Sequence, residues 1–143
     1  MSIFTKNQKI QVRVFFIDNN VSIRFLEANE AKEMIEKREK GETTDVVNVL
    51  NTVWKNLSWK ENTEVINDSR IVSAVGGEPD FNVYKYREHR LKKCLVEWDL
   101  KDDKGVVIPI TADVVDSLDA DFAVGLLNAF DQKRVGGSDP EKK

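Results

Sequence analysis

Side chains that could do acid–base or nucleophilic chemistry are sparse in this 143-residue chain, which contains one histidine and one cysteine. His89 lies between Glu88 and Arg90, and no nucleophile or second acid–base group accompanies it at a recognisable spacing. No serine lies in a nucleophile-elbow pattern. The sequence therefore predicts no catalytic residue, no cofactor and a protein that is not an enzyme.

An acidic cluster raises the question of a calcium site, because hard cations require several oxygen ligands from a short loop. The cluster consists of Asp99, Asp102 and Asp103. An EF-hand loop that opened at Asp99 would end on an isoleucine instead of a glutamate, and its glycine would fall one position late. We therefore interpret this cluster as a solvated turn and predict no metal site.

A basic segment with interleaved tyrosines is the one candidate for nucleic-acid contact; its basic residues are Lys85, Arg87, Arg90, Lys92 and Lys93. The whole chain has 22 basic and 25 acidic residues, with a formal net charge of −3. This balance leaves little surplus charge to neutralise phosphates, so nucleic acid is a disfavoured partner.

Aromatic side chains are the candidate partner-binding residues, because they commonly anchor protein interfaces even though most of them pack in cores. The candidates are Trp54, Trp59, Tyr84 and Trp98. Two of the tryptophans suggest a binding surface near residues 54–59. Replacement of Trp59 with alanine is expected to weaken partner capture without unfolding the domain, whereas unfolding would assign Trp59 to the core.

The elements that position these residues must come from a chain with 41% apolar and 33% charged residues, a composition that can bury a core at this length. We predict one α+β domain over 1–133, with an internal boundary near 76–79 and a disordered tail over 134–143. There is no signal-peptide stretch and no run of about 20 apolar residues. With Cys94 unpaired, the sequence favours a soluble cytoplasmic protein that does not engage a membrane.

The N-terminal half begins with alternating apolar residues on both sides of Asp18-Asn19-Asn20, which predicts a β-hairpin over about 9–26. A helix capped by Asn29 and ended by Gly41 should follow. Apolar residues at three- and four-residue spacing predict a second helix over 44–57. Residues 58–79 lack a clear period, and we interpret them as connecting segments, with a short strand or helix left open as an alternative.

The C-terminal half is expected to be helical, with Asp80 capping a long helix that carries an apolar stripe to Trp98 and includes Cys94. A tight turn is predicted over 102–105, and Pro109 keeps the next strand short or at an edge. Thr111 then caps a short helix that reaches Leu118. A final helix should bury the stripe Phe122, Leu126, Leu127 and Phe130. The predicted fold is thus an N-terminal β-hairpin followed by a mainly helical domain with a mobile tail.

The segment Lys93-Cys-Leu-Val-Glu-Trp-Asp-Leu100 is followed by Asp-Asp-Lys-Gly105, then Ile108-Pro-Ile-Thr111, a short helix and a final apolar helix. This order resembles the tail assembly chaperones of long-tailed bacteriophages, whose typical segment has a similar Trp, an acidic turn with Gly and an apolar-Pro-apolar-Thr helix entry. The resemblance covers residues 85–130.

The resemblance implies a non-enzymatic protein of the host cytoplasm that acts in virion assembly without joining the virion. It would bind the largely helical tape-measure protein and keep it soluble while tail-tube subunits polymerise around it, and the tail-tube protein is a second expected partner. Homo-oligomerisation is left open. The alternative is a structural head–tail adaptor or tail-completion protein, which copurification with virions would favour. An apolar groove with a charged exterior would suit the chaperone, and the stripes that contain Tyr84 and Phe122 are the candidates for it.

Overall fold

The fold is α+β, with an antiparallel sheet and five helices in the part of the chain that the computed structural model describes, which is residue 3 and residues 9–71 and 80–135. The predicted boundary near 76–79 lies outside these residues, as does most of the predicted tail. The elements in chain order are β1 (Ile10–Asp18), β2 (Ile23–Leu26), α1 (Ala28–Glu39), β3 (Asn48–Trp54), α2 (Trp59–Asp68), β4 (Arg70–Ile71), β5 (Asp80–Phe81), α3 (Val83–Cys94), β6 (Leu95–Trp98), α4 (Ala112–Asp116) and α5 (Ala120–Val135).

The main sheet has the strand order β2-β1-β3-β6, and every neighbouring pair is antiparallel. The predicted hairpin of β1 and β2 is confirmed, with Phe16 opposite Phe25. Asn20 takes a positive φ of 69° in the turn, as expected for an asparagine at a tight reversal. Strand β3 pairs with β1 from Ile10↔Trp54 to Phe16↔Asn48, so the centre of the sheet comes from segments about 40 residues apart.

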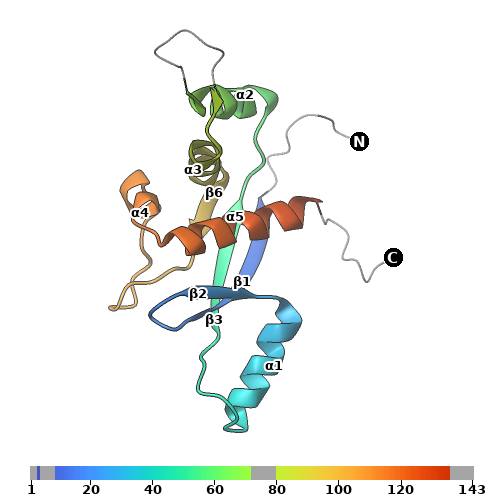
Figure 1. Cartoon of the computed structure of the whole chain (residues 1–143), viewed down its shortest axis with the longest axis vertical. Helices are drawn as coiled ribbons and strands as arrows, with labels where there is room; N and C mark the ends of the chain where they lie inside the picture. The colour runs from blue at the N-terminus through green and yellow to red at the C-terminus, as the bar shows by residue number, and fades with distance from the viewer. Residues whose placement is uncertain (1–2, 4–8, 72–79, 136–143) are drawn as a thin grey trace.

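Alternation along β1 divides its side chains between two apolar clusters. Val12, Val14 and Phe16 belong to the main core beneath α5, whereas Phe15 and Ile17 pack with Ala31 of α1 on the other face. Helix α5 crosses the first face, and α1 lies at the β2 end of the sheet (Figure 1).

The final helix is confirmed, and it buries all four residues of its predicted stripe: Phe122, Leu126, Leu127 and Phe130. It extends to Val135, so the predicted tail is wrong for residues 134 and 135. The predicted turn also forms: Asp102 N donates to Val106 O, and Gly105 has a φ of 79°. Thr111 caps α4 by accepting a hydrogen bond from Val114 N, as its position predicted.

The helix predicted over 44–57 is wrong, because residues 48–54 form the central strand β3. The strand buries Leu50, Thr52 and Trp54 at a spacing of two residues. Thr52 broke the apolar alternation in the sequence. Its buried hydroxyl donates to Val12 O at 2.7 Å, and this hydrogen bond allows a polar residue at a core position.

The predicted helix over 80–98 is two elements, since α3 ends at Cys94 and β6 follows. A register shift between β3 and β6 puts two residues of β6 opposite one of β3. Leu95 and Trp98, three residues apart, are therefore both buried although they lie in a strand, a spacing that imitates a helical stripe. The predicted caps were also displaced: Asn82, not Asp80, caps α3, and Glu27, not Asn29, caps α1.

Residues 58–71, predicted to be connecting segments, contain α2 and β4. Ser58 and Glu61 form a reciprocal capping box at the start of α2: Ser58 Oγ accepts from Glu61 N, and Ser58 N donates to Glu61 Oε1. The Ser-x-x-Glu spacing is the sequence signature of this motif and could have revealed the helix. No described helix combines the length and the apolar content that a bilayer crossing requires.

Candidate partner-binding site

Trp54, a predicted partner-binding residue, lies in the core with none of its surface exposed. Its ring stacks on that of Phe130 with centroids 4.5 Å apart and an interplanar angle of 7°. The indole N–H donates to Thr52 Oγ1 at 2.7 Å, so both its apolar surface and its donor are satisfied inside the protein. Trp54 therefore offers no surface to a partner in this fold, and its assignment to the binding surface is wrong.

Trp98 is also a core residue, with 7% of its surface exposed. Its indole N–H donates to Ile108 O at 2.6 Å. This bond holds the segment after the 102–105 turn against the end of β6. Its predicted role in partner binding is therefore replaced by a structural one.

Trp59 and Tyr84 are the two predicted residues that remain accessible, with 90% and 81% of their surfaces exposed. They line different hollows. Trp59, the first residue of α2, borders a polar hollow of about 720 Å³ that also includes Asn56 and Arg134. Tyr84, in the first turn of α3, borders an apolar groove of about 540 Å³.

The groove at Tyr84 lies between α3, α4 and α5, and we call it the α3/α5 groove. Its floor is made of aliphatic side chains from all three helices: Leu91, Val115, Ala123, Val124 and Leu127. Its charged rim consists of Arg87, Glu88, Asp116 and Asp121. An apolar floor with a charged rim is the arrangement that accepts the apolar face of an amphipathic helix.

Part of the rim is already neutralised within the protein. The Lys92 ammonium lies 2.8 Å from both Glu88 Oε1 and Asp116 Oδ1, which links α3 to α4. Hydrogen bonds to Asp116 and to Glu88 raise the pKa of Lys92. Arg87 and Asp121 form no ion pair with the described residues, so they are the charges that a partner can meet.

A second ion pair fixes the helices that wall the groove. Arg90 of α3 donates from Nη1 and Nη2 to the two carboxylate oxygens of Asp131 on α5, at 3.0 and 2.6 Å. The hydrogen bond to Asp131 raises the pKa of Arg90, and the same contact lowers the pKa of Asp131. Because bidentate pairs constrain both distance and orientation, this contact sets the separation of α3 and α5.

Three of the five basic residues in the α3 segment form such internal ion pairs. Lys93 lies 3.2 Å from Glu64 of α2, in addition to the pairs made by Arg90 and Lys92. Within residues 9–71 and 80–135, only Lys85 and Arg87 of this segment carry a charge without an ion-pair partner. A phosphate backbone that approached this segment would therefore meet two basic side chains that have no ion-pair partner among the described residues.

Two carboxylates of the acidic cluster, those of Asp99 and Asp102, accept hydrogen bonds within the protein. Asp102 Oδ1 accepts from the backbone N–H groups of Lys104 and Val106, and Asp99 accepts from the backbone and the side chain of Asn51. Among the residues that the structure describes, no group of three or more His, Cys, Asp or Glu side chains is arranged to hold a metal ion. Cys94 is buried, and that burial raises the pKa of its thiol.

The sequence offered two apolar stripes as candidates for a groove, and Tyr84 and Leu91 of the first stripe line the groove that the structure forms. It offered Phe122, Leu126 and Phe130 as a groove, and these side chains are buried in the main core. On α5 the groove is lined by Leu127, which also belongs to that core, and by Ala123 and Val124, which follow Phe122 in the chain. Small residues on an otherwise bulky helix were the available signal, because they leave room for a partner.

Comparison of the chain with protein-family models, with curated proteins and with solved structures found no match.

Proposed function

We propose that this protein is a non-enzymatic tail assembly chaperone of a long-tailed bacteriophage, which binds an amphipathic helix of the tape-measure protein in the α3/α5 groove. The observation that carries the proposal is the groove itself, with its aliphatic floor and charged rim. It lies within residues 85–130, the segment that resembles this family, apart from Tyr84 at its edge. A groove formed by helices matches a helical partner in both shape and chemistry.

The open apolar surface and the rim charges of the groove indicate the side chains that the partner helix should carry. Apolar side chains at i, i+3 and i+4 would fill the space above Ala123 and Val124 and remove that surface from water. Arg87 and Asp121 stand on the rim without an internal ion-pair partner among the described residues. A helix with an acidic residue on one flank and a basic residue on the other would pair with both, and such pairing fixes orientation more than it raises affinity.

Coexpression with the tape-measure protein of the same phage genome tests the function. The tape-measure protein should stay in the soluble fraction when this chain is present and aggregate when it is absent. Purified virions should lack this chain. If the tape-measure protein aggregates equally in both cases, the chaperone function is excluded, and if the chain copurifies with virions, the structural adaptor is favoured.

Val124→Arg tests the groove, since the side chain of residue 124 lines it and is half-buried. An arginine there should weaken binding of the tape-measure helix by about tenfold or more, a loss of at least about 1.4 kcal/mol in binding, and should lower the yield of soluble tape-measure protein. The matched control is Val21→Arg in the exposed hairpin turn, which should behave as wild type. Circular dichroism must show both variants folded.

Two further variants test which of the two exposed aromatic residues, Trp59 or Tyr84, contacts the partner. Tyr84→Ala should weaken capture by removing an anchor at the rim of the groove. If Trp59→Ala abolishes capture while Tyr84→Ala and Val124→Arg retain it, the binding surface is the hollow at residues 56–59, and the assignment to the α3/α5 groove is wrong.

A further inference from the structure

The first half of β1 has a strand neighbour on one side only among the described residues. Strand β3 pairs with β1 from Ile10 onwards, but β2 pairs only with the segment Phe15–Asp18. Residues 10–14 therefore form an edge of the sheet. The cause is local, since β2 ends at Leu26 and Glu27 becomes the N-cap of α1, where a reciprocal capping box with Glu30 turns the chain away.

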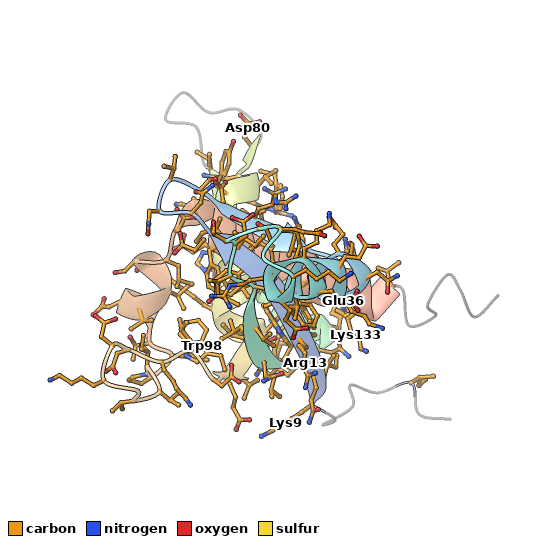
Figure 2. The ribbon with its side chains drawn as sticks, turned by 90° about the horizontal axis from the view of Figure 1, so that it is seen from below. Lys9, Arg13, Glu36, Asp80, Trp98 and Lys133 are labelled. Atoms are coloured by element: carbon orange, nitrogen blue, oxygen red, sulfur yellow. The ribbon has the colours of Figure 1, made fainter. Side chains whose placement is uncertain are left out.

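A recess of about 830 Å³ lies beside this edge. Its long wall is the backbone and side chains of residues 11–15 of β1, and its end wall is the Phe25–Ala28 segment that leads into α1. Helix α5 contributes Gly125, Asn128, Ala129 and Lys133 on the side of the main core. Figure 2 shows Arg13 and Lys133 on the side of the molecule opposite Asp80.

The chemistry of the edge specifies its ligand. In an antiparallel strand, alternate residues direct both their N–H and C=O groups to the same side, so a run of five edge residues presents unpaired donors and acceptors in a fixed two-residue repeat. The backbone of an extended peptide has the complementary repeat. Residues 10–14 contain no proline, and the register shift of the sheet lies between β3 and β6, so neither a proline nor a bulge interrupts this edge.

We propose that residues 10–14 of β1 bind an extended peptide segment of a partner protein by strand addition. The peptide would run antiparallel to β1. It would continue the position of β2 in the sheet beyond Leu26, where β2 ends. This is a second binding surface, separate from the α3/α5 groove, and it does not depend on the proposed chaperone function.

The surroundings of the edge define the side chains of the peptide. Residues on its inner face would meet Gly125 and Ala129, together with Val14, so they should be apolar. Residues on its outer face would lie beside Arg13, which donates to Asn51 Oδ1 and has no ion-pair partner among the described residues. A carboxylate opposite Arg13 is a favourable cross-strand neighbour, so the recess selects a segment in which apolar and acidic residues alternate.

A second copy of this chain is a poorer occupant. In two copies that paired through this edge, α5 and the start of α1 of one copy would collide with the same elements of the other copy. A single extended segment has no such walls and fills the recess alone.

The test uses a displayed library of random peptides of about eight residues, long enough to span the edge. Selection on the full chain should yield peptides with alternating apolar and acidic residues. Methylation of single backbone nitrogens in a selected peptide should then weaken binding at least tenfold at every second position and little at the positions between, because strand addition uses alternate N–H groups. Amide protons of alternate residues within 10–14, those directed away from β3, should also become protected from exchange.

Asn128→Trp, at an exposed position on α5 that lines the recess, should abolish binding of the selected peptide. The matched control Val135→Trp, at an exposed position outside the recess, should leave binding unchanged. The groove variant Val124→Arg should also retain the peptide, which separates this proposal from the proposed function. The proposal is overturned if no peptide distinguishes wild type from Asn128→Trp, or if the effect of methylation has no two-residue period.

Discussion

At the scale of single residues, the Arg90–Asp131 pair shows how the surroundings of a charge decide its role. The side chain of Arg90 is 10% exposed and that of Asp131 38% exposed. Arg90 also lies 5.6 Å from the centre of the Tyr86 ring, so its guanidinium is held by a carboxylate and an aromatic face together. A residue that looked like part of a nucleic-acid surface thus joins α3 to α5.

Asp131→Asn should lower the free energy of unfolding by about 1–3 kcal/mol at pH 7, because Arg90 would lose its charged partner in a largely buried place. Partial exposure of Asp131 keeps the effect below that of a fully buried pair. Chemical denaturation followed by circular dichroism measures it. A loss below about 0.5 kcal/mol, the usual range for surface substitutions, would show that the pair adds nothing to stability.

The same substitution gives a prediction for pH. The folded protein lowers the pKa of Asp131, mainly through the hydrogen bonds from Arg90. The contribution to stability is therefore present above the pKa of Asp in the unfolded chain, about 3.9, and is lost as the pH falls through the lower pKa of the folded state. The difference between wild type and Asp131→Asn should shrink below about pH 4. An unchanged difference at pH 2 would contradict this linkage.

At the scale of elements, α5 is the centre of the molecule, and one glycine controls how closely it approaches the sheet. A Cβ placed on Gly125 would overlap the ring of Phe25 in β2. That ring has little freedom to move, because it packs against Phe16 at 5.9 Å and Phe122 at 5.8 Å between ring centroids. Gly125 therefore allows α5 to lie directly on the hairpin.

Gly125→Ala should destabilise the protein even though alanine is the better helix former. Overpacking costs about 1–3 kcal/mol, and the gain in helix propensity offsets at most about 1 kcal/mol of it. Thermal unfolding is the measurement. Gly125→Ala should cost less stability in a Phe25→Leu background than in the wild type, because the smaller side chain makes room for the methyl group. Strictly additive effects would refute the proposed overlap.

At the scale of the whole molecule, tertiary packing gives the three tryptophans different environments. Trp54 and Trp98 lie in the main core, and Trp59 is exposed. Among the hollows that the same packing leaves between the described residues are the α3/α5 groove and the recess at the edge of β1. These surfaces are the basis of both binding proposals.

Trp54→Ala should cost about 3–5 kcal/mol of stability, because it removes a fully buried ring from between β3 and α5. Trp59→Ala should change stability by less than about 0.5 kcal/mol. Urea denaturation monitored by circular dichroism compares the two, and fluorescence quenching by acrylamide should reach Trp59 far more readily than Trp54. Equal losses of stability would contradict the assignment of Trp59 to the surface.

Local rules predicted the elements whose causes are local. The hairpin, the 102–105 turn, the Thr111 cap and the buried stripe of α5 each depend on residues within a few positions of one another, and each was predicted correctly. Strands β3 and β6 were missed together because each is paired with the other, and a bulge gave β6 a helical spacing. A strand buried by distant partners carries no reliable local signal.

The sequence alone determined the α+β class, the scarcity of histidine and cysteine, and the hydrophobic face of the last helix, since composition and periodicity act along the chain. It could not decide which aromatic residues reach solvent, because burial depends on what packs above each ring. Only the tertiary structure placed Trp54 and Trp98 in the core and paired Arg90, Lys92 and Lys93 of α3 with carboxylates. It also left residues 10–14 of β1 with a strand neighbour on one side only, among the described residues. The Arg90–Asp131 pair alone joins residues 41 positions apart, beyond the reach of any local pattern.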